Sequence, residues 1–264
     1  MNDTQSPTTD YRTLTQAQVN SFWTHGFLSI GKILTDEEIT QLRTEYDREF
    51  ARARAGETTV RNLSATNNNG ARSEEAAAKE VLQIMQMCER NLHFYRLLYH
   101  ERILDIIEDL IGPNIQLFHD QGLYKPAHHG GEVYWHQDNA YWRCSPPNLI
   151  SCWLTLDDVT AENGAMQFLP GTHFQAKEHS RAQSSDTLLD LGDQMGDAEP
   201  VVADLPAGGI TIHHCQVLHH TAPNTTDRQR RALAIHYMTP GTRSLRTGEY
   251  LGVSFSRPLL RARV

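Results

Sequence analysis

Two stretches near the N-terminus carry the start signals and the hydrophobic pattern of α-helices. Thr15 with Gln18, and Thr35 with Glu38, have the spacing of a capping box, in which two side chains satisfy the free N–H groups of a helix start. After the second box, apolar residues recur at steps of three and four, which places them on one helical face. These residues are Ile39, Leu42, Tyr46 and Phe50. The pattern predicts two N-terminal helices that pack against a core.

A helical pattern also covers residues 80–111. Large apolar side chains recur there at three- and four-residue steps, and Gly112-Pro113 follows as a stop signal. We therefore expect two further helices. Residues 56–79, which precede them, hold few large apolar groups and are expected to form a loop or weak helix that could border a site.

Beyond residue 112 the period of the pattern changes from that of a helix to that of a strand. In LISCWLTLDD (149–158), every second residue from Ile150 to Leu156 is apolar, as on one face of a strand. Further strands are expected at 115–125, 131–136, 165–169, 209–214 and 231–239, with glycine-containing turns between several of them. Helices followed by many short strands predict an α+β fold with a β-sandwich or barrel core.

The whole chain, 1–264, is interpreted as a single domain. Residues 10–112 form its mainly helical part, residues 113–240 its β core, and residues 241–264 a C-terminal segment. A polar, acidic insertion at 175–200 interrupts the strands. An insertion of this length in a compact domain is typical of a functional lid or flexible loop.

Composition narrows the choice of partners and location. The net charge of −8 disfavours non-specific nucleic-acid binding, and no apolar run approaches the roughly 20 residues that cross a bilayer. The first ten residues lack the basic start and apolar core of a secretory signal, and the four cysteines form no C-x-x-C pair. We expect a cytoplasmic monomer or homodimer with reduced thiols, acting on a small molecule without nucleic-acid or membrane partners.

A histidine and a carboxylate that could share a metal ion stand in YWHQD. His136 and Asp138 are two residues apart, so on a strand their side chains would share a face. A third histidine could come from HHCQVLHH (213–220), about eighty residues later. Two imidazoles and one carboxylate leave three positions of an octahedral ion open, as in non-haem Fe(II) oxygenases, whereas zinc prefers a tetrahedral site. The H-x-D pattern alone is also compatible with two polar surface residues on a strand.

Several ordered segments resemble the phytanoyl-CoA dioxygenase family of Fe(II)- and 2-oxoglutarate-dependent oxygenases. The resemblance covers nearly the whole chain. Its segments are VNSFWTHGFLSIGKILTDEEITQLR, GPNIQLFHDQGLYKP, GGEVYWHQD, LISCWLTLDDVTAENGAMQFLPGTH and LPAGGITIHHCQVLHHTAPNTTDRQRRALAIHY. It implies a double-stranded β-helix, the jelly-roll core of cupin-like proteins, with N-terminal helices packed on it.

The resemblance also implies a ligand set. Iron would be held by His136, Asp138 and His219, the last of which precedes the turn TAPN. Arg230 follows His219 by eleven residues, where the family places the arginine that binds the distal carboxylate of 2-oxoglutarate. A guanidinium suits that task because its rigid fork of donors meets a carboxylate in two parallel bonds. The neighbouring Arg231 would be a surface or sheet-edge charge.

Further site residues follow from the same resemblance. Thr221, Gln121 and Trp153 are expected to help bind the co-substrate, although Trp153 could be a plain core aromatic and Gln121 an outward strand residue. His214 would support the metal site, and His220 stands where the family commonly has glycine. Substrate contacts are sought in the residues that surround and follow the H-x-D pair: Trp142, Gln137, Asn139 and Arg143.

The implied activity is a dioxygenase that uses Fe(II), 2-oxoglutarate and O2 and releases succinate and CO2 while oxidising a substrate. Related halogenases replace the carboxylate with a small residue, so Asp138 favours hydroxylation of a C–H bond, with desaturation, ring closure or epimerisation as alternatives. Two rivals are a cupin-like dioxygenase that does not use 2-oxoglutarate and a non-catalytic ligand-binding protein. A small substrate that is not linked to CoA is preferred, since CoA phosphates would need a basic patch. The residues that could form one are Arg243, Arg246, Arg257, Arg261 and Arg263.

Overall fold

Two antiparallel β-sheets face each other in a computed structural model that describes residues 11–64, 79–182, 185, 187–192 and 198–263. The main sheet has eight strands in the order β1-β12-β7-β14-β4-β3-β2, with β16 also paired to β4. These strands are β1 (Phe27–Lys32), β2 (Arg61–Asn62), β3 (Leu82–Met85), β4 (Ile115–Lys125), β7 (Ile150–Thr155), β12 (Gly209–His214), β14 (Arg230–Met238) and β16 (Leu259–Arg261).

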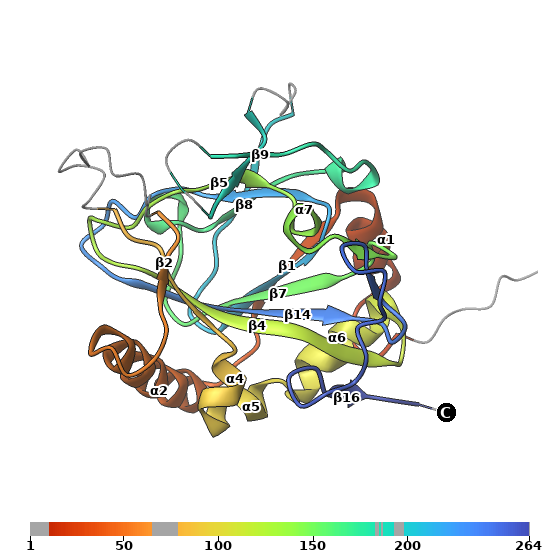
Figure 1. The fold of residues 1–264 in the computed structure, drawn as a ribbon, viewed down its shortest axis with the longest axis horizontal. Coiled ribbons are helices and arrows are strands. Elements are labelled where there is room, and N and C mark those ends of the chain that lie inside the picture. The colour runs from red at the N-terminus through yellow and green to blue at the C-terminus, as the bar shows by residue number, and fades with distance from the viewer. Residues whose placement is uncertain (1–10, 65–78, 183–184, 186, 193–197, 264) are drawn as a thin grey trace, which may run out of the picture.

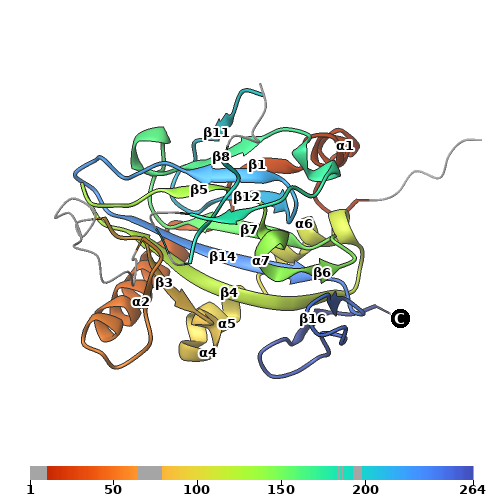
Figure 2. The ribbon, with the colours of Figure 1, turned by 45° about the horizontal axis from the view of Figure 1, so that its top comes forward.

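The second sheet has the order β11-β8-β13-β5 and lies above the main sheet in Figure 1; in Figure 2, where the top is turned forward, β5, β8 and β11 cross the upper part of the picture near β1 and β12. Its strands are β5 (Val133–His136), β8 (Met166–Leu169), β11 (Val201–Ala203) and β13 (Leu218–Thr221). Two facing antiparallel sheets with long crossing connections form a jelly roll, and the predicted α+β fold with a double-stranded β-helix core is confirmed.

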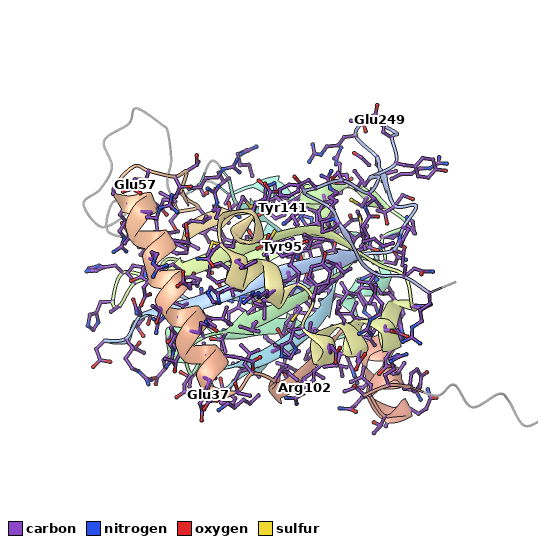
Figure 3. The ribbon with its side chains drawn as sticks, turned by 90° about the horizontal axis from the view of Figure 1, so that it is seen from below. Glu37, Glu57, Tyr95, Arg102, Tyr141 and Glu249 are labelled. Carbon is purple, nitrogen blue, oxygen red and sulfur yellow. The ribbon has the colours of Figure 1, made fainter. Side chains whose placement is uncertain are left out.

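Helices cover the other face of the main sheet. In Figure 3, seen from below, the long helix between the labels Glu37 and Glu57 crosses the strands, and the short helix with Tyr95 lies beside it. The helices are α1 (Gln16–His25), α2 (Asp36–Arg54), α4 (Met87–Arg90), α5 (Leu92–Leu97), α6 (Glu101–Ile111) and α7 (Asp138–Trp142). Both predicted capping boxes form, at Thr15 and at Thr35. The apolar faces of α1, α2, α4, α5 and α6 and of the main sheet bury the largest hydrophobic cluster between them, whereas α7 lies at the cavity between the sheets.

The predicted helical reading of residues 80–111 is wrong at its start. Residues 82–85 form β3, which pairs with β4 at the edge of the main sheet, and α4, α5 and α6 follow. Leu82 and Ile84 point into the core while Gln83 and Met85 face a cavity, so both faces are covered. The apolar residues of β3 therefore recur at spacings that also fit a helix. Only the pairing with β4 shows that the segment is a strand.

Besides β3, the strands of the two sheets that lie outside the predicted ranges are β1, β2, β11, β13 and β16. β1 pairs with β12, and β13 lies between β8 and β5. The other expected strands of the β core form close to the predicted positions, and β4 and β12 coincide with 115–125 and 209–214.

Within the insertion 175–200, the described residues include a small hairpin of β9 (Ser180–Arg181) and β10 (Leu189–Asp190). Residues 183–184, 186 and 193–197 lie outside the described part of the chain. All four cysteines are buried and free. Across the described ranges, the search for a helix with the length and apolarity of a membrane span finds none.

The register of three central strands places inward side chains in rows. Ser151 on β7 pairs with His236 on β14, which pairs with His119 on β4. Two residues along, Trp153, Ala234 and Gln121 form the next row, and Arg230 lies opposite Lys125 at the far end of β14. Because residues two apart on a strand share a face, these rows line the floor between the sheets.

Candidate metal centre and co-substrate pocket

Three buried side chains converge between the two sheets. His136 ends β5, His219 lies directly opposite it on β13, and Asp138 is the first residue of α7. Oδ1 of Asp138 lies 3.8 Å from Nε2 of His136 and 3.7 Å from Nε2 of His219. Across the described residues, no other group of three or more His, Cys, Asp or Glu side chains has its potential ligand atoms gathered this closely.

The placement of Asp138 corrects the expectation that the H-x-D pair lies on one strand. The strand ends at His136, and Gln137 is extended (φ −106°, ψ 130°) and precedes the first turn of α7. Because this intervening residue is extended, the side chains on either side of it still point the same way. His136 and Asp138 therefore face the same site, although Asp138 lies in a helix and not on the strand.

Both imidazoles are held with one nitrogen free. Nδ1 of His136 lies 2.7 Å from the Tyr134 carbonyl, and Nδ1 of His219 lies 3.0 Å from the Val217 carbonyl. A carbonyl only accepts, so each Nδ1 carries the proton and each Nε2 offers a lone pair toward Asp138. Burial lowers the pKa of His136, and that of His219 well below its usual value. Neutral imidazole is the form that binds a metal.

The carboxylate of Asp138 is held through its other oxygen. Oδ2 accepts a hydrogen bond from the Ser151 hydroxyl at 2.8 Å and from Nε2 of His213 at 3.3 Å. Burial alone would raise the pKa of Asp138, but the electrostatic interaction with the His219 ring and the hydrogen bond from His213 bring the pKa well below its usual value. The oxygen that faces the two imidazoles is thus available as an anionic ligand.

A directional chain of hydrogen bonds leads from β3 to this carboxylate. Since Ser151 donates to Asp138, it accepts from Nδ1 of His236 at 2.7 Å, and Nε2 of His236 accepts from the Gln121 amide at 3.0 Å. The Gln121 oxygen in turn accepts from the Gln83 amide. The chain fixes the orientation of every polar group in it.

Sequence reasoning missed most of this chain. None of His236, Ser151 and Gln83 was predicted as a site residue. Gln121 points inward, which corrects the outward alternative, but its amide is occupied by His236 and Gln83. The signal in the sequence was the alternation of β7, which puts Ser151 on the same face as Trp153.

A cavity of about 280 Å3 contains the three convergent side chains, close to the lower end for small-molecule sites. Four of the residues expected to bind co-substrate or substrate line it: Gln121, Trp153, Thr221 and Trp142. Trp142 packs against Phe118 and His236, at 5.1 Å and 4.7 Å between ring centroids.

Arg230 also lines the cavity and is an almost fully buried cation, with 1% of its surface exposed. Its Nη1 donates to the Leu123 carbonyl at 3.1 Å, and its guanidinium lies 5.6 Å from the ring of Trp153. Its Nε has no hydrogen-bond partner among the described residues. Burial lowers the pKa of Arg230 to about 10. A buried cation without an anion is costly, so the site is built for an anionic ligand.

Arg231 has the opposite environment. Its guanidinium donates to both oxygens of Asp157, at 3.0 Å and 2.6 Å, and to Asp47 at 2.8 Å. These carboxylates hold the pKa of Arg231 above its usual value against the effect of burial. Arg231 is a saturated structural ion pair, 9% exposed, rather than the surface charge expected from the sequence.

Three expected substrate contacts do not line the cavity. Gln137 is buried and ties down the insertion: its amide donates to the Gln175 and Gln216 carbonyls, and its oxygen accepts from the Lys177 amide. Asn139 exchanges two hydrogen bonds with the backbone of Cys144 at the end of α7, and Arg143 is exposed with φ +53°. Gln137 and Arg143 flank α7 and Asn139 lies within it, and none of the three is among the residues that line the cavity.

Of the histidines in 213–220, His219 lies where the resemblance implied, and the others differ from expectation. His213, rather than His214, contacts Asp138, because the side chain of His213 lies on the face of β12 that lines the cavity. His214 accepts from the Gln216 amide and packs near His173. His220 lines the cavity while its Nε2 pairs with Glu132 at 2.8 Å and its ring stacks on Trp135.

The mouth of the cavity is bordered by the two segments that the sequence marked as loops. Arg61 and Leu63 come from the first, and Thr187 and Leu188 from the insertion. The two segments are joined, since the Thr187 hydroxyl donates to the Leu63 carbonyl at 3.1 Å. The amide of Leu189 donates to the Tyr141 hydroxyl at 2.6 Å, which fastens the insertion to α7.

A jelly roll with this donor set and an unpaired arginine defines a non-haem iron dioxygenase of the 2-oxoglutarate-dependent class. The family model described as phytanoyl-CoA dioxygenase matches residues 22–232. The chain belongs to the phytanoyl-CoA dioxygenase family.

Two curated relatives show the range of the family. A probable alpha-ketoglutarate-dependent hypophosphite dioxygenase from Stutzerimonas stutzeri is 28% identical over 186 residues, 66% of this chain and 64% of the relative. The peroxisomal phytanoyl-CoA dioxygenase of Rattus norvegicus is 26% identical over 242 residues, 87% of this chain and 70% of the relative. The chain thus spans about two thirds of the length of these relatives.

Solved structures share the fold. The non-haem alpha-ketoglutarate-dependent carbocyclase SnoK from nogalamycin biosynthesis superposes with a TM-score of 0.76 at 21% identity, covering 95% of this chain and 99% of that one. The epimerase SnoN, solved with Fe3+, alpha-ketoglutarate and nogalamycin RO, gives 0.75 at 20% identity, covering 93% and 98%. At these identities the likeness concerns the fold.

Proposed function

We propose that the protein is an Fe(II)- and 2-oxoglutarate-dependent dioxygenase that hydroxylates an unactivated C–H bond of a small molecule and releases succinate and CO2. The observation that carries the proposal is Arg230, a buried guanidinium without an anion, in the same cavity as the His136, Asp138 and His219 cluster. A cupin-like dioxygenase without 2-oxoglutarate would have no use for this cation.

The residues of the cavity divide the work. His136, Asp138 and His219 would hold the iron, which supplies O2 activation when bound. Arg230 would bind the distal carboxylate of 2-oxoglutarate, with the Thr221 hydroxyl as a second donor and Trp153 packed beside the guanidinium. Asp138 is retained as an anionic ligand, which favours hydroxylation over halogenation.

The substrate is inferred to be a small molecule with an apolar body that is not linked to CoA. Apolar side chains on the cavity wall include Met85, Leu188 and the ring of Trp142. Two of the C-terminal arginines are already paired with carboxylates, which leaves fewer cations for CoA phosphates. Arg261 pairs with Asp105 and Glu108 at 2.6 Å and 2.7 Å, and Arg263 reaches Glu108 at 3.4 Å.

We also propose that the protein works in the cytoplasm as a monomer or homodimer. The free, buried cysteines and the net charge of −8 support this location, since neither a disulfide framework nor a basic membrane-binding face is needed.

The test is succinate formation that depends on added substrate. Purified protein with Fe(II), 2-oxoglutarate and O2 is screened against a metabolite library for succinate above the uncoupled background. For each hit, the product is analysed by mass spectrometry after reaction under 18-O2. Incorporation of one labelled oxygen atom, at one succinate per product, is expected. Unchanged substrate oxidation without 2-oxoglutarate would overturn the proposal. The proposal would also be overturned if no succinate formed in any reaction, either with the library compounds or in the uncoupled background.

A further inference from the structure

A second buried cation lies beside Arg230. Lys125 is the last residue of β4 and is paired in register with Arg230, the first residue of β14. None of its surface is exposed, and its amine is surrounded by backbone and hydroxyl oxygens rather than by a carboxylate. Burial, followed by the neighbouring charge of Arg230, holds the pKa of Lys125 well below its usual value. Burying such an amine without a carboxylate partner costs folding free energy. We therefore expect the position of the amine to have a function.

All three donors of the amine are directed at one turn of β13. Nζ lies 3.1 Å from the Thr221 carbonyl, 2.8 Å from the Thr221 hydroxyl oxygen and 2.5 Å from the Ala222 carbonyl. In its protonated form the Lys125 amine donates all three N–H groups and accepts nothing, so the Thr221 hydroxyl is the acceptor of its bond. The hydroxyl proton is therefore left to donate to something else.

That proton has the cavity in front of it. Thr221 lines the cavity together with Arg230, whereas Lys125 is not one of the lining residues. Lys125 can thus influence a bound molecule through the Thr221 hydroxyl and through its charge, but does not touch the molecule itself.

On one side, the Lys125 side chain is tightly packed against the turn at Gly164. Gly164 has φ +93°, and a Cβ there would lie 3.2 Å from Nζ of Lys125 and 2.9 Å from the Ala222 carbonyl oxygen. A side chain at this position would press on the amine and on one of its acceptors. The turn at Gly164 therefore closes over the lysine and keeps the amine on Thr221.

We propose that Lys125 is a positioning residue for the co-substrate: it holds the Thr221 hydroxyl as a hydrogen-bond donor to the distal carboxylate that Arg230 binds. The inference rests on the proposed function. It gives the two oxygens of that carboxylate two different partners, the guanidinium of Arg230 and the hydroxyl of Thr221, and it explains why an amine that reaches no ligand is buried here.

The test compares two keto acids that differ only in the group concerned. Dissociation constants are measured anaerobically with Fe(II) for 2-oxoglutarate and for 2-oxopentanoate, which has a methyl group in place of the distal carboxylate. Lys125→Met should weaken 2-oxoglutarate binding by about 10- to 100-fold, the size of a hydrogen bond to a charged group. Binding of 2-oxopentanoate should stay unchanged. Lys32→Met, which removes an exposed lysine on β1, serves as the control.

A double-mutant cycle shows whether the effect passes through Thr221. Thr221→Val should weaken 2-oxoglutarate binding to a similar degree, Thr221→Ser should retain most of it, and Lys125→Met combined with Thr221→Val should be little weaker than either single variant. In turnover, Lys125→Met should raise KM for 2-oxoglutarate and leave kcat at saturation largely intact.

Several results would overturn the inference. One is a Lys125→Met variant that still prefers 2-oxoglutarate over 2-oxopentanoate as the wild type does, and another is equal weakening of both keto acids. If Lys125→Met fails to fold, Lys125→Gln is measured in the same way, and normal 2-oxoglutarate affinity in Thr221→Val would refute the inference whatever the lysine variants do. A wild-type protein that binds neither keto acid would instead refute the proposed function.

Discussion

Arg230 and Arg231 are adjacent in the sequence and both are buried, but within the ranges that the structure describes only Arg231 has carboxylate partners. Successive residues of a strand face opposite sides, so one guanidinium enters the cavity and the other meets Asp157 and Asp47 behind the sheet. Without a ligand, the unpaired cation of Arg230 destabilises the folded protein, whereas the paired cation of Arg231 stabilises it.

Substitution of Arg230 should therefore change the affinity for 2-oxoglutarate, and substitution of Arg231 should change the stability of the fold. Arg230→Met should lower 2-oxoglutarate affinity by about thirtyfold to several thousandfold, the size of a lost buried charge pair, and should leave the melting temperature equal or higher. Arg231→Met should lower the melting temperature because it removes two hydrogen bonds to Asp157 and one to Asp47, with little effect on affinity. Titration and thermal unfolding of both variants check this, and equal losses of affinity would mean that the wrong arginine was assigned.

Asp120 offers a residue-scale prediction about pH. Burial raises the pKa of Asp120 to about 6; Oδ2 accepts from the Cys88 amide at 3.0 Å, and Oδ1 has no partner in the described chain. A carboxyl group that keeps its proton better when folded stabilises the protein most below its unfolded pKa of about 4. This contribution is lost as the pH rises through 6.

Asp120→Asn should thus stabilise the protein at pH 8 by about 2–3 kcal/mol relative to wild type, and by much less near pH 4. Denaturant unfolding at the two pH values gives the difference. Asp227→Asn, at an exposed site, is the control and should show no such pH dependence. A stabilisation that is larger at pH 4 than at pH 8 would contradict the assignment.

At the scale of elements, α7 and the insertion form one wall of the site. α7 begins with the ligand Asp138, and its Tyr141 and Trp142 line the cavity. Gln137 fastens the start of the insertion and the Tyr141 hydroxyl fastens Leu189, so Leu188 is held against the cavity. We propose that this part of 175–200 covers the substrate.

Removal of one fastening tests that proposal. Tyr141→Phe keeps the ring beside His136 and deletes the acceptor of the Leu189 amide. We expect a KM for substrate raised by about 5- to 10-fold, the value of one hydrogen bond, and more succinate formed without product, with 2-oxoglutarate affinity unchanged. Tyr95→Phe, on the helical face, is the matched control. A variant with normal substrate KM and tight coupling would show that this contact does not hold the wall in place.

At the scale of the whole molecule, the site joins the two sheets. His136 and His219 come from the second sheet and Arg230 from the main sheet, while Asp138 is bonded to Ser151 of the main sheet. A ligand that contacts all of them binds the folded chain and not the unfolded one, so it stabilises the fold as a unit.

Fe(II) and 2-oxoglutarate together should raise the melting temperature. At about 100 times the dissociation constant the gain is about 2.7 kcal/mol, or roughly 5–10 °C for a chain of this size. Differential scanning fluorimetry under anaerobic conditions measures the shift, and removal of iron with a chelator should reverse it. His219→Ala should show little of the shift, and an equal rise in that variant would place the metal elsewhere.

The sequence by itself determined what depends on neighbouring residues and on ordered motifs. The capping boxes at Thr15 and Thr35 formed as written, because caps are local hydrogen bonds. The alternation of β7 and the segments that resemble the family were sufficient to predict the jelly roll. The four residues His136, Asp138, His219 and Arg230 do share one cavity.

Only the tertiary structure decided which groups meet across the fold. The strand β3 was hidden in a helical pattern because pairing with β4, rather than local periodicity, sets its period. The strand ends at His136 and α7 follows, so Asn139 and Arg143 do not line the cavity, which spacing along a strand could not foresee. Lys125 reads in sequence as an ordinary strand end; its register with Arg230 and its bonds to Thr221 exist only because two distant segments are brought together. A hydrogen bond between such segments depends on positions in space, and those are fixed only when the whole core has packed.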